Sequence, residues 1–199
     1  MTDVAIIDNG GANIASLRFA LDRLGARAQL TTEPDALRRA RRVILPGVGA
    51  AADAMERLRS LQLVDLIPTL TQPVLGICLG MQLLFASSDE GDTTCLGLID
   101  ARVSRFPDRA GLPVPHMGWN QVRARWESPL LQGLADDSYM YFVHSYAAPV
   151  GPWTVATTDY GGGFSAVVRQ RNFHGAQFHP ERSARAGSRV LRNFLELAA

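Results

Sequence analysis

Short apolar runs alternate with longer amphipathic stretches through the first half of the chain. The runs have the length and composition of buried strands, and they occur at 4–7, 28–32, 42–45 and 74–77. The stretches between them place apolar residues three or four positions apart. They predict helices at 13–24, 33–41, 50–61 and 63–70. Strands that alternate with helices indicate a parallel sheet with helices on both faces.

The second half of the chain is richer in strand-like segments, with glycine and proline between them. These segments lie at 101–106, 121–126, 139–146, 153–158, 164–169 and 175–178. A last amphipathic stretch at 188–197 predicts a C-terminal helix. We therefore expect an α/β fold: an open, mostly parallel twisted sheet of the flavodoxin-like kind with helices on both faces, joined to a β-rich C-terminal half.

Size and charge narrow the class of protein. The 199 residues, 47% of them hydrophobic, suit one domain over 1–199 with a sizeable core. A net charge of +1 argues against nucleic acid or an anionic membrane as the main partner. All 20 basic residues are arginines, which excludes a Walker lysine, a Schiff-base lysine and a pyridoxal-phosphate attachment site on this chain.

The start of the chain and its cysteines argue against a secreted or membrane protein. Residues 1–3 lack the basic region of a signal peptide, and no apolar run reaches the roughly 18 residues that span a membrane. Cys78 and Cys95 show no metal-ligand spacing and are too few for a disulfide framework. We expect a reduced, cytoplasmic protein that needs neither a metal nor a cofactor.

Cys78 stands between Gly76 and Gly80, where the apolar run 74–77 gives way to a helical pattern. This G-x-C-x-G arrangement is the cysteine form of the nucleophile elbow, a sharp strand-to-helix turn in which glycines avoid collisions of the backbone. The start of a helix also favours the reactive thiolate. A buried structural cysteine is the alternative, since free cysteines are commonly buried, but the two glycines favour the nucleophile.

A nucleophilic cysteine needs a base, and His179-Pro180-Glu181 supplies a candidate after the last expected strand. Pro180 biases His179 toward an extended conformation, in which residues two apart project to similar sides. The Glu181 carboxylate can then fix the imidazole tautomer while the other ring nitrogen faces the thiol. A solvated loop is the alternative. The remaining histidines have no carboxylate within two residues and are expected to be structural or interface groups: His116, His144 and, in a turn before the last strand, His174.

Several motifs carry a resemblance to a known family. They read P-G-V-G-A at 46–50, G-I-C-L-G-M-Q at 76–82, P-H-M-G-W-N at 115–120, Y-F-V-H-S-Y at 141–146 and G-A-Q-F-H-P-E at 175–181. The two that contain Cys78 and His179 resemble the class I, or triad, glutamine amidotransferases. The other three resemble, more narrowly, the glutaminase subunits of imidazole glycerol phosphate synthase, which act in histidine biosynthesis.

The resemblance implies a role for each matching residue. Cys78 would attack the carboxamide of glutamine, His179 would shuttle the proton, and Glu181 would orient the imidazole. Backbone N–H groups around the developing oxyanion would come from Gly47, Val48, Gly49 and Leu79. The amino and carboxylate groups of glutamine would be held by Gln82 and Glu90, with backbone at Ser145 and Tyr146.

Without the resemblance these positions have plainer interpretations. Residues 47–49 would form a tight turn, Gln82 and Glu90 would be polar positions on or after a helix, and Trp119 would be a core aromatic residue.

The resemblance also implies a partner. Ammonia would pass to a separate (β/α)-barrel synthase subunit that forms a heterodimer with the glutaminase and makes imidazole glycerol phosphate and an aminoimidazole carboxamide ribotide. Little activity is expected without the partner and its ligand. The residues implied at this interface are Asn13, Arg18, Met117, Trp119 and Arg182. Two departures from the family pattern would alter partner contacts: Ala51 replaces a usual aromatic residue, and Arg182 replaces a common lysine.

Two alternatives remain open at this point, and a third lacks its signature. Another triad amidotransferase, serving anthranilate, pyridoxal phosphate or guanylate synthesis, would share the triad and differ in the acceptor of ammonia. A flavodoxin-like binding module would cradle a phosphate with 10–11 and 47–49, although these glycines lack the G-x-G-x-x-G spacing. A papain-like protease would need a C-G-[SA]-C-[WY] signature, which this sequence lacks.

Overall fold

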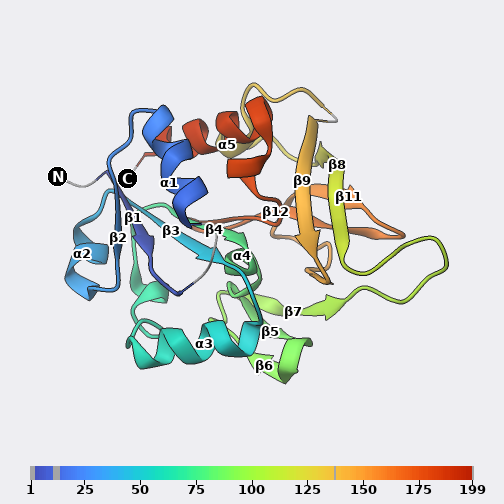
Figure 1. Ribbon diagram of the computed structural model, residues 1–199, viewed down its shortest axis with the longest axis horizontal. Coiled ribbons are helices and arrows are strands. Elements are labelled where there is room, and N and C mark those ends of the chain that lie inside the picture. Colours follow the sequence, from blue (N-terminus) through green and yellow to red (C-terminus); the bar gives the residue numbers. More distant parts are fainter. Residues whose placement is uncertain (1–2, 11–13, 137, 199) are drawn as a thin grey trace.

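A nine-stranded mixed sheet forms the centre of the computed structural model (Figure 1), which describes residues 3–10, 14–136 and 138–198. Its parallel half contains, in spatial order, β2 (Ala28–Thr31), β1 (Val4–Ile7), β3 (Arg42–Gly47), β4 (Val74–Cys78) and β13 (Phe173–Ala176). Its antiparallel half continues with β12 (Gly163–Gln170), β11 (Thr154–Asp159), β8 (His116–Ala124) and β9 (Ser138–His144). The expected α/β fold with a β-rich C-terminal half is confirmed.

Helices cover both faces of the parallel half. On one face lie α1 (Ile14–Arg23) and α5 (Ala184–Glu196), and on the other lies α3 (Ala51–Ser60), as Figure 1 shows. The short helix α2 (Pro34–Arg39) connects β2 with β3, and α4 (Leu79–Gln82) follows β4 without a break. Among the described residues, none of the helices has the length and apolar character needed to cross a membrane.

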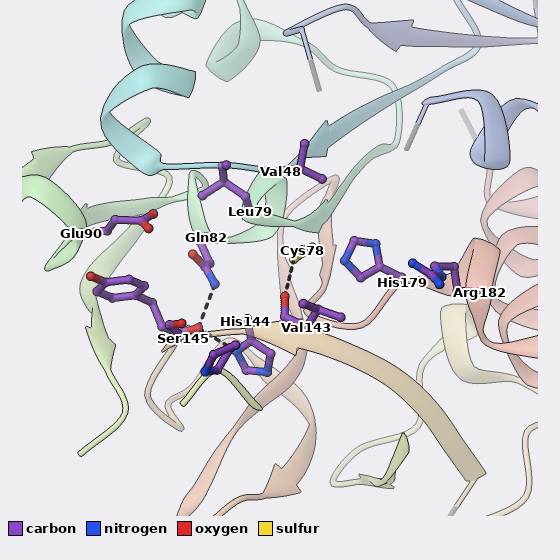
Figure 2. Close-up of a pocket in the computed structure, with 13 residues that line it drawn as sticks. Val48, Cys78, Leu79, Gln82, Glu90, Val143, His144, Ser145, His179 and Arg182 are labelled. Atoms are coloured by element: carbon purple, nitrogen blue, oxygen red, sulfur yellow. Dashed lines mark hydrogen bonds between the residues drawn. The ribbon is translucent and has the colours of Figure 1, made fainter. Parts of the chain in front are cut away.

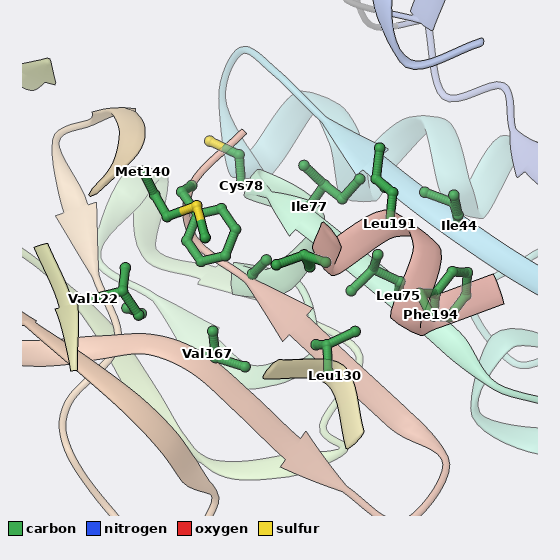
Figure 3. Close-up of a cluster of buried hydrophobic side chains, with 14 of the residues drawn as sticks. Ile44, Leu75, Ile77, Cys78, Val122, Leu130, Met140, Val167, Leu191 and Phe194 are labelled. Carbon is green, nitrogen blue, oxygen red and sulfur yellow. The ribbon is translucent and has the colours of Figure 1, made fainter. Parts of the chain in front are cut away.

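The central strands are buried on both faces, so alternate residues of a strand belong to different apolar clusters. In β1, Ile6 packs in the cluster that contains α1 and α5, whereas Ile7 packs in the cluster that contains α3. Figure 3 shows the first cluster, in which Leu191 and Phe194 of α5 lie near Leu75 of β4. This two-sided burial explains why the strands read as continuous apolar runs in the sequence.

A second, four-stranded sheet is built from β10 (Tyr146–Ala147), β7 (Ile99–Arg105), β5 (Phe85–Ser88) and β6 (Thr93–Thr94), in that order. β5 starts shortly after α4, and β10 follows β9 in the large sheet. The small sheet therefore lies near the carboxyl end of β4, where Cys78 is found.

Some expected elements were wrong, for local reasons. The helix expected at 63–70 is only a 3-10 turn at Ile67–Thr69, because Pro68 has no N–H to continue a helix that begins at 63. The helical pattern after Cys78 ends at Gln82, and β5 follows instead. The strand expected from 121 begins at His116, and the last strand lies two residues earlier than expected, so that His174 is buried in β13 rather than in a turn.

Candidate active site

Cys78 occupies a strained turn between β4 and α4. Its backbone has φ 53° and ψ −112°, a conformation that residues with a Cβ rarely adopt and that fits a nucleophile elbow. A Cβ on Gly76 would lie 2.5 Å from the carbonyl oxygen of Gly80, and a Cβ on Gly80 would overlap the Leu45 carbonyl. Both positions therefore need glycine, and the close packing holds the thiol at the carboxyl edge of the parallel strands.

His179 and Glu181 form a close pair at the start of a 3-10 turn, Pro180–Arg182. His179 Nδ1 lies 2.9 Å from Glu181 Oε1, and both side chains are almost fully buried, at 7% and 3% exposure. The backbone of His179 is fixed as well, since its N–H donates to the Tyr141 carbonyl and its carbonyl accepts from Ser183 Oγ at 2.7 Å. The imidazole is held with its Nε2 edge free to face the thiol.

The electrostatic setting of His179 favours its protonated form. Burial of the ring lowers its pKa, but hydrogen bonds with Cys78 and Glu181 and the negative charge of both groups outweigh burial and raise the pKa. Figure 2 shows the Cys78 and His179 side chains facing each other across the pocket. The arrangement suits a thiolate–imidazolium pair, in which the histidine already holds the proton that the nucleophile has lost.

The Cys78 thiol has two further polar neighbours. The carbonyl oxygen of Val143 lies 3.7 Å from Sγ, and Gln177 Nε2 donates to Sγ at 3.8 Å. Gln177 is fully buried just after β13. Gln177 belongs to the motif at 175–181, but no local pattern in the sequence predicts its contact with a residue 99 positions away.

A pocket of about 370 Å³ opens over Cys78 (Figure 2). It is lined by Val48, Gly49, Cys78, Leu79, Gln82, Glu90, Pro115, Val143, His144, Ser145, Tyr146, His179 and Arg182. The structure thus brings together nearly all of the catalytic, oxyanion and glutamine-binding residues that the sequence predicted. Gly47 and Glu181 lie one layer behind, beside a small cavity of about 20 Å³.

Gln82 is buried in the wall of this pocket and has defined partners. Its Nε2 donates to the Tyr146 carbonyl at 2.8 Å and to Gln177 Oε1 at 3.0 Å. The neighbouring carbonyl of Ser145 accepts from the N–H of Phe106. Hydrogen bonds therefore tie the polar wall together and connect it to Cys78 through Gln177.

Glu90 has a structural contact in addition to its place in the pocket. Its Oε2 accepts from the backbone N–H of Ala51 at 2.7 Å, at the first turn of α3. Burial raises the pKa of Glu90, and the Ala51 hydrogen bond partly offsets this. Ala51, noted in the sequence as a departure from the family pattern, is thus the helix position that Glu90 caps.

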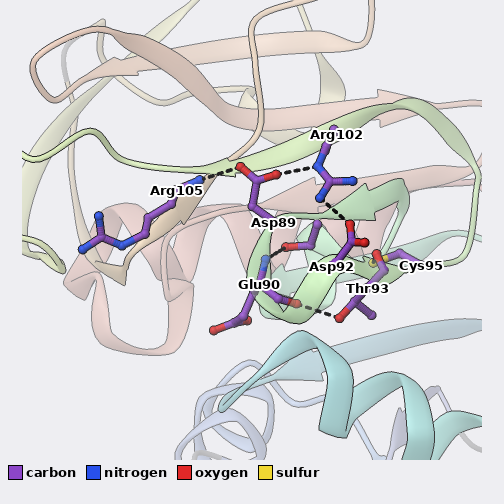
Figure 4. Close-up of polar contacts among 8 residues, drawn as sticks. Asp89, Glu90, Asp92, Thr93, Cys95, Arg102 and Arg105 are labelled. Carbon is purple, nitrogen blue, oxygen red and sulfur yellow. Dashed lines mark hydrogen bonds and ion pairs between the residues drawn. The ribbon is translucent and has the colours of Figure 1, made fainter.

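Polar contacts hold the loop that carries Glu90 (Figure 4). Arg102 bridges two carboxylates, with Nε 2.5 Å from Asp89 and Nη2 2.6 Å from Asp92, and Thr93 Oγ1 donates to the Glu90 carbonyl at 2.6 Å. The Arg102 ion pairs are exposed, so each adds little stability, but together they link the loop to β7.

The residues implied at a partner interface are mostly exposed. Arg18 is exposed on α1, while Met117 and Trp119 are 64% and 52% exposed on β8. The interpretation of Trp119 as a core residue is therefore wrong. The Arg182 guanidinium lies 4.9 Å over the Tyr141 ring and also lines the pocket. Asn13 lies outside the described residues.

Over the described part of the chain, no cluster of histidine, cysteine and acidic side chains has the makings of a metal site. The pocket places a cysteine beside a histidine at the carboxyl edge of an α/β sheet, an arrangement that can support nucleophilic chemistry.

Comparison with known proteins first defines the class. The family model described as glutamine amidotransferase class-I matches residues 5–198, so the chain belongs to the class I glutamine amidotransferases. Two solved structures share the fold. One is described as a glutamine amidotransferase (TM-score 0.74, 21% identity, 98% of this chain and 97% of that one). The other is PurLQS from Thermotoga maritima (TM-score 0.74, 18% identity, 98% of each chain).

Curated relatives then define the family within this class. The chain is 56% identical over 198 residues to imidazole glycerol phosphate synthase subunit HisH of Xanthomonas axonopodis pv. citri (strain 306), covering 100% of this chain and 99% of the relative. It is 52% identical over 196 residues to the protein of the same name from Yersinia pseudotuberculosis serotype I (strain IP32953), covering 98% and 100%. The chain is a member of this family of synthase subunits.

Proposed function

We propose that the chain hydrolyses glutamine to glutamate and ammonia with Cys78, His179 and Glu181, and that it passes the ammonia to a separate (β/α)-barrel subunit of imidazole glycerol phosphate synthase. Together the two subunits would make imidazole glycerol phosphate and aminoimidazole carboxamide ribotide in histidine biosynthesis. We place this activity in the cytoplasm. Membership in the HisH family supports the pathway.

One observation carries the catalytic part of the proposal. A strained Cys78 and a buried His179, 101 residues apart in sequence, line one pocket, and Glu181 lies behind His179 within hydrogen-bond distance of its ring. Structural cysteines have no need of a positive backbone φ or of a base whose pKa is raised by contact with the thiol.

The reaction follows from this geometry. Cys78 Sγ attacks the carboxamide carbon of glutamine, and His179 gives its proton to the departing nitrogen, so that ammonia leaves and a thioester to Cys78 remains. A water molecule then attacks the thioester carbon while His179 takes one of its protons. Glutamate leaves, the thiolate–imidazolium pair is restored, and one water has been consumed for each ammonia released.

The negative oxygen that develops on the carbonyl carbon needs hydrogen-bond donors. Val48, Gly49 and Leu79 line the pocket on the side of Cys78, and their backbone N–H groups are the proposed donors, with Gly47 positioning the segment. Donors of this type stabilise the transition state by about 3 kcal/mol each.

The far end of the pocket is proposed to hold the amino-acid part of glutamine. Gln82 and Glu90 line it together with Ser145 and Tyr146. The Glu90 carboxylate suits an ammonium group, and backbone groups at Ser145 and Tyr146 complete the set. The pocket lies within the range of volumes typical of small-molecule sites.

Glutamine hydrolysis tests the proposal. Ammonia release would be measured for the chain alone, and again when the barrel subunit is present with its nucleotide ligand, with Cys78→Ala as the control. We expect a low basal rate and a large stimulation that the substitution abolishes. Hydrolysis that ignores this partner would contradict the pathway, and the absence of hydrolysis under every condition would contradict the glutaminase.

A further inference from the structure

Two buried histidines that are not among the proposed catalytic residues lie next to the pocket and contact each other. His116 of β8 and His144 of β9 are directly opposite each other in the antiparallel pairing, and they are 3% and 6% exposed. His116 Nδ1 lies 3.2 Å from His144 Nε2. His144 lines the pocket, and neither residue takes part in the proposed chemistry.

The tautomer of His144 follows from its other contact. His144 Nδ1 lies 2.8 Å from the Tyr146 carbonyl oxygen, which can only accept. Nδ1 must therefore carry the proton, and in the neutral ring Nε2 is left as an acceptor. That acceptor requires a donor from His116, so His116 Nδ1 is protonated as well and His116 Nε2 is an acceptor.

Asn120 supplies the donor that His116 Nε2 requires. Its Nδ2 lies 3.3 Å from His116 Nε2 and donates to the Asp159 carbonyl at 2.8 Å, while its Oδ1 accepts from the Gln121 N–H at 2.8 Å. These two backbone contacts fix the amide orientation independently of the histidines. Asn120 is thus a donor to His116, as the tautomers require.

Packing and burial keep the two rings in place and uncharged. The His116 ring stacks between Tyr160 and Phe142, with centroid distances of 4.1 and 5.0 Å. Burial lowers the pKa of His116 to about 4 and that of His144 to about 3. Both rings are therefore neutral at neutral pH, where a second proton on either ring would leave a donor facing another donor.

We propose that Asn120, His116 and His144 form a hydrogen-bond relay in which each residue donates to the next and His144 donates to the Tyr146 carbonyl. This relay positions the Tyr146 carbonyl and Gln82 for binding of the substrate. The Tyr146 carbonyl accepts from His144 on one side and from Gln82 on the other. Figure 2 shows Gln82 and His144 close together on this wall of the pocket. All three members of the relay are positioning residues, since Gln82 and backbone at 145–146 are the proposed substrate contacts.

The relay also ties the pocket to an exposed surface. His116 and Asn120 lie on one face of β8, and Met117 and Trp119 lie exposed on the other. A partner that contacts Met117 or Trp119 therefore touches the same strand that orients the pocket wall. The role in glutamine binding rests on the proposed function, whereas the direction of the hydrogen bonds does not.

Nitrogen NMR of the histidine rings tests the relay without any reaction. We expect His116 and His144 of the chain, labelled with ¹⁵N at histidine, to be neutral with the proton on Nδ1 at pH 7. Signals would be assigned by their loss in His116→Asn and His144→Asn. A proton on Nε2 of either ring, alone or with one on Nδ1, would overturn the relay.

Kinetics test whether the relay positions the substrate groups. In His144→Asn the side-chain amide can occupy the place of Nδ1 and still donate to the Tyr146 carbonyl, whereas His144→Leu cannot. We expect His144→Leu to raise KM for glutamine about tenfold or more with a smaller change in kcat, and His144→Asn to restore most of the loss. His174→Leu, which removes a buried histidine outside the relay, is the matched control and should leave KM unchanged.

The outcomes separate the relay from the glutaminase. Equal KM values for wild type and His144→Leu, or equal losses in His144→Asn, His144→Leu and His174→Leu, would overturn the positioning role while the glutaminase stands. If the wild type hydrolyses no glutamine, both the proposed function and the role of the relay in glutamine binding are contradicted. The NMR result still decides in that case whether the relay exists.

Discussion

The backbone of Gly80 packs against the carbonyl group of Leu45 so closely that a Cβ on residue 80 would overlap it. This contact joins the start of α4 to β3, the strand that leads into 47–49. The two proposed sources of oxyanion donors flank this contact in sequence, since Leu79 precedes Gly80 and 47–49 begins two residues after Leu45. The distance between the two sets of proposed donors therefore depends on a glycine that is not among the residues lining the pocket.

Substitution of this glycine tests the dependence. In Gly80→Ala the methyl group pushes α4 from β3, and we expect kcat for glutamine hydrolysis to fall at least about tenfold, with a loss of about 1–3 kcal/mol in the free energy of unfolding. Gly163→Ala is the control, because a Cβ there meets open space. Wild-type kinetics in Gly80→Ala would contradict this account of the elbow.

The raised pKa of His179 predicts a pH dependence of stability. Burial lowers this pKa, and contact with Cys78 and Glu181 raises it by more, so the folded protein binds the proton more tightly than the unfolded chain does. The resulting stabilisation is complete below the unfolded pKa of about 6.5 and is lost as pH rises through the folded pKa. Glu181→Gln should weaken this effect.

Urea unfolding measured across about pH 6.5 to 9 tests whether the free energy of unfolding falls as pH rises. We expect the wild type to lose more stability over this window than Glu181→Gln, which keeps the shape of the side chain without its charge. Parallel curves for the two proteins would show that Glu181 does not raise the pKa of His179.

Glu90 has a structural contact with Ala51 and a proposed role in binding glutamine, and different substitutions separate the two. Glu90→Gln keeps an acceptor for the Ala51 N–H but removes the charge, so we expect KM for glutamine to rise at unchanged stability. Glu90→Ala also removes the helix contact and should lose about 1 kcal/mol of stability in addition. Thermal melting and glutamine kinetics of both variants make the comparison. An unchanged KM in Glu90→Gln would leave Glu90 with the structural role alone.

How far the sequence predicted this site depends on the range of each signal. The elbow around Cys78 and the spacing of His179 and Glu181 are local, and both could be read from neighbouring residues. The apolar strands of the parallel half were equally clear, because burial on both faces leaves little ambiguity. That the histidine–glutamate pair would face the thiol was an inference from strand order, and the structure brings the three side chains together, with Glu181 directly behind His179 at the pocket wall.

Other features had no local signal. The sequence predicted that this strand begins at 121, whereas β8 begins at His116. Its inward positions include His116 and Asn120, whose polar side chains break the alternation of apolar and polar residues expected of a strand. Their hydrogen-bond partners come from β9 and from the end of β11, so only the fold shows that they are satisfied. The contact of Gln177 with Cys78 depends in the same way on residues far apart in sequence.

The exposed aromatic residue of β8, Trp119, predicts the side on which the barrel subunit binds. Trp119 is 52% exposed and packs edge-on against Tyr141, which in turn lies under Arg182 at the rim of the pocket. In a titration of the two chains, we expect Trp119→Ala to weaken their association at least about tenfold. Trp126→Ala, beyond the other end of the strand and 61% exposed, is the matched control. Equal losses in both variants would contradict this surface.

Covalent labelling tests the central claim, that Cys78 is a nucleophile in a glutamine site, most directly. The chain has a built-in control, since Cys95 is also buried and burial raises its pKa to about 11. A glutamine-shaped chloroketone would be incubated with the protein, alone and with an excess of glutamine, and the labelled residues would be read by mass spectrometry of peptides. The account predicts one label per chain, on Cys78, which glutamine prevents and which His179→Ala slows. Labelling of Cys95 at the same rate, or labelling of Cys78 that glutamine does not affect, would contradict it.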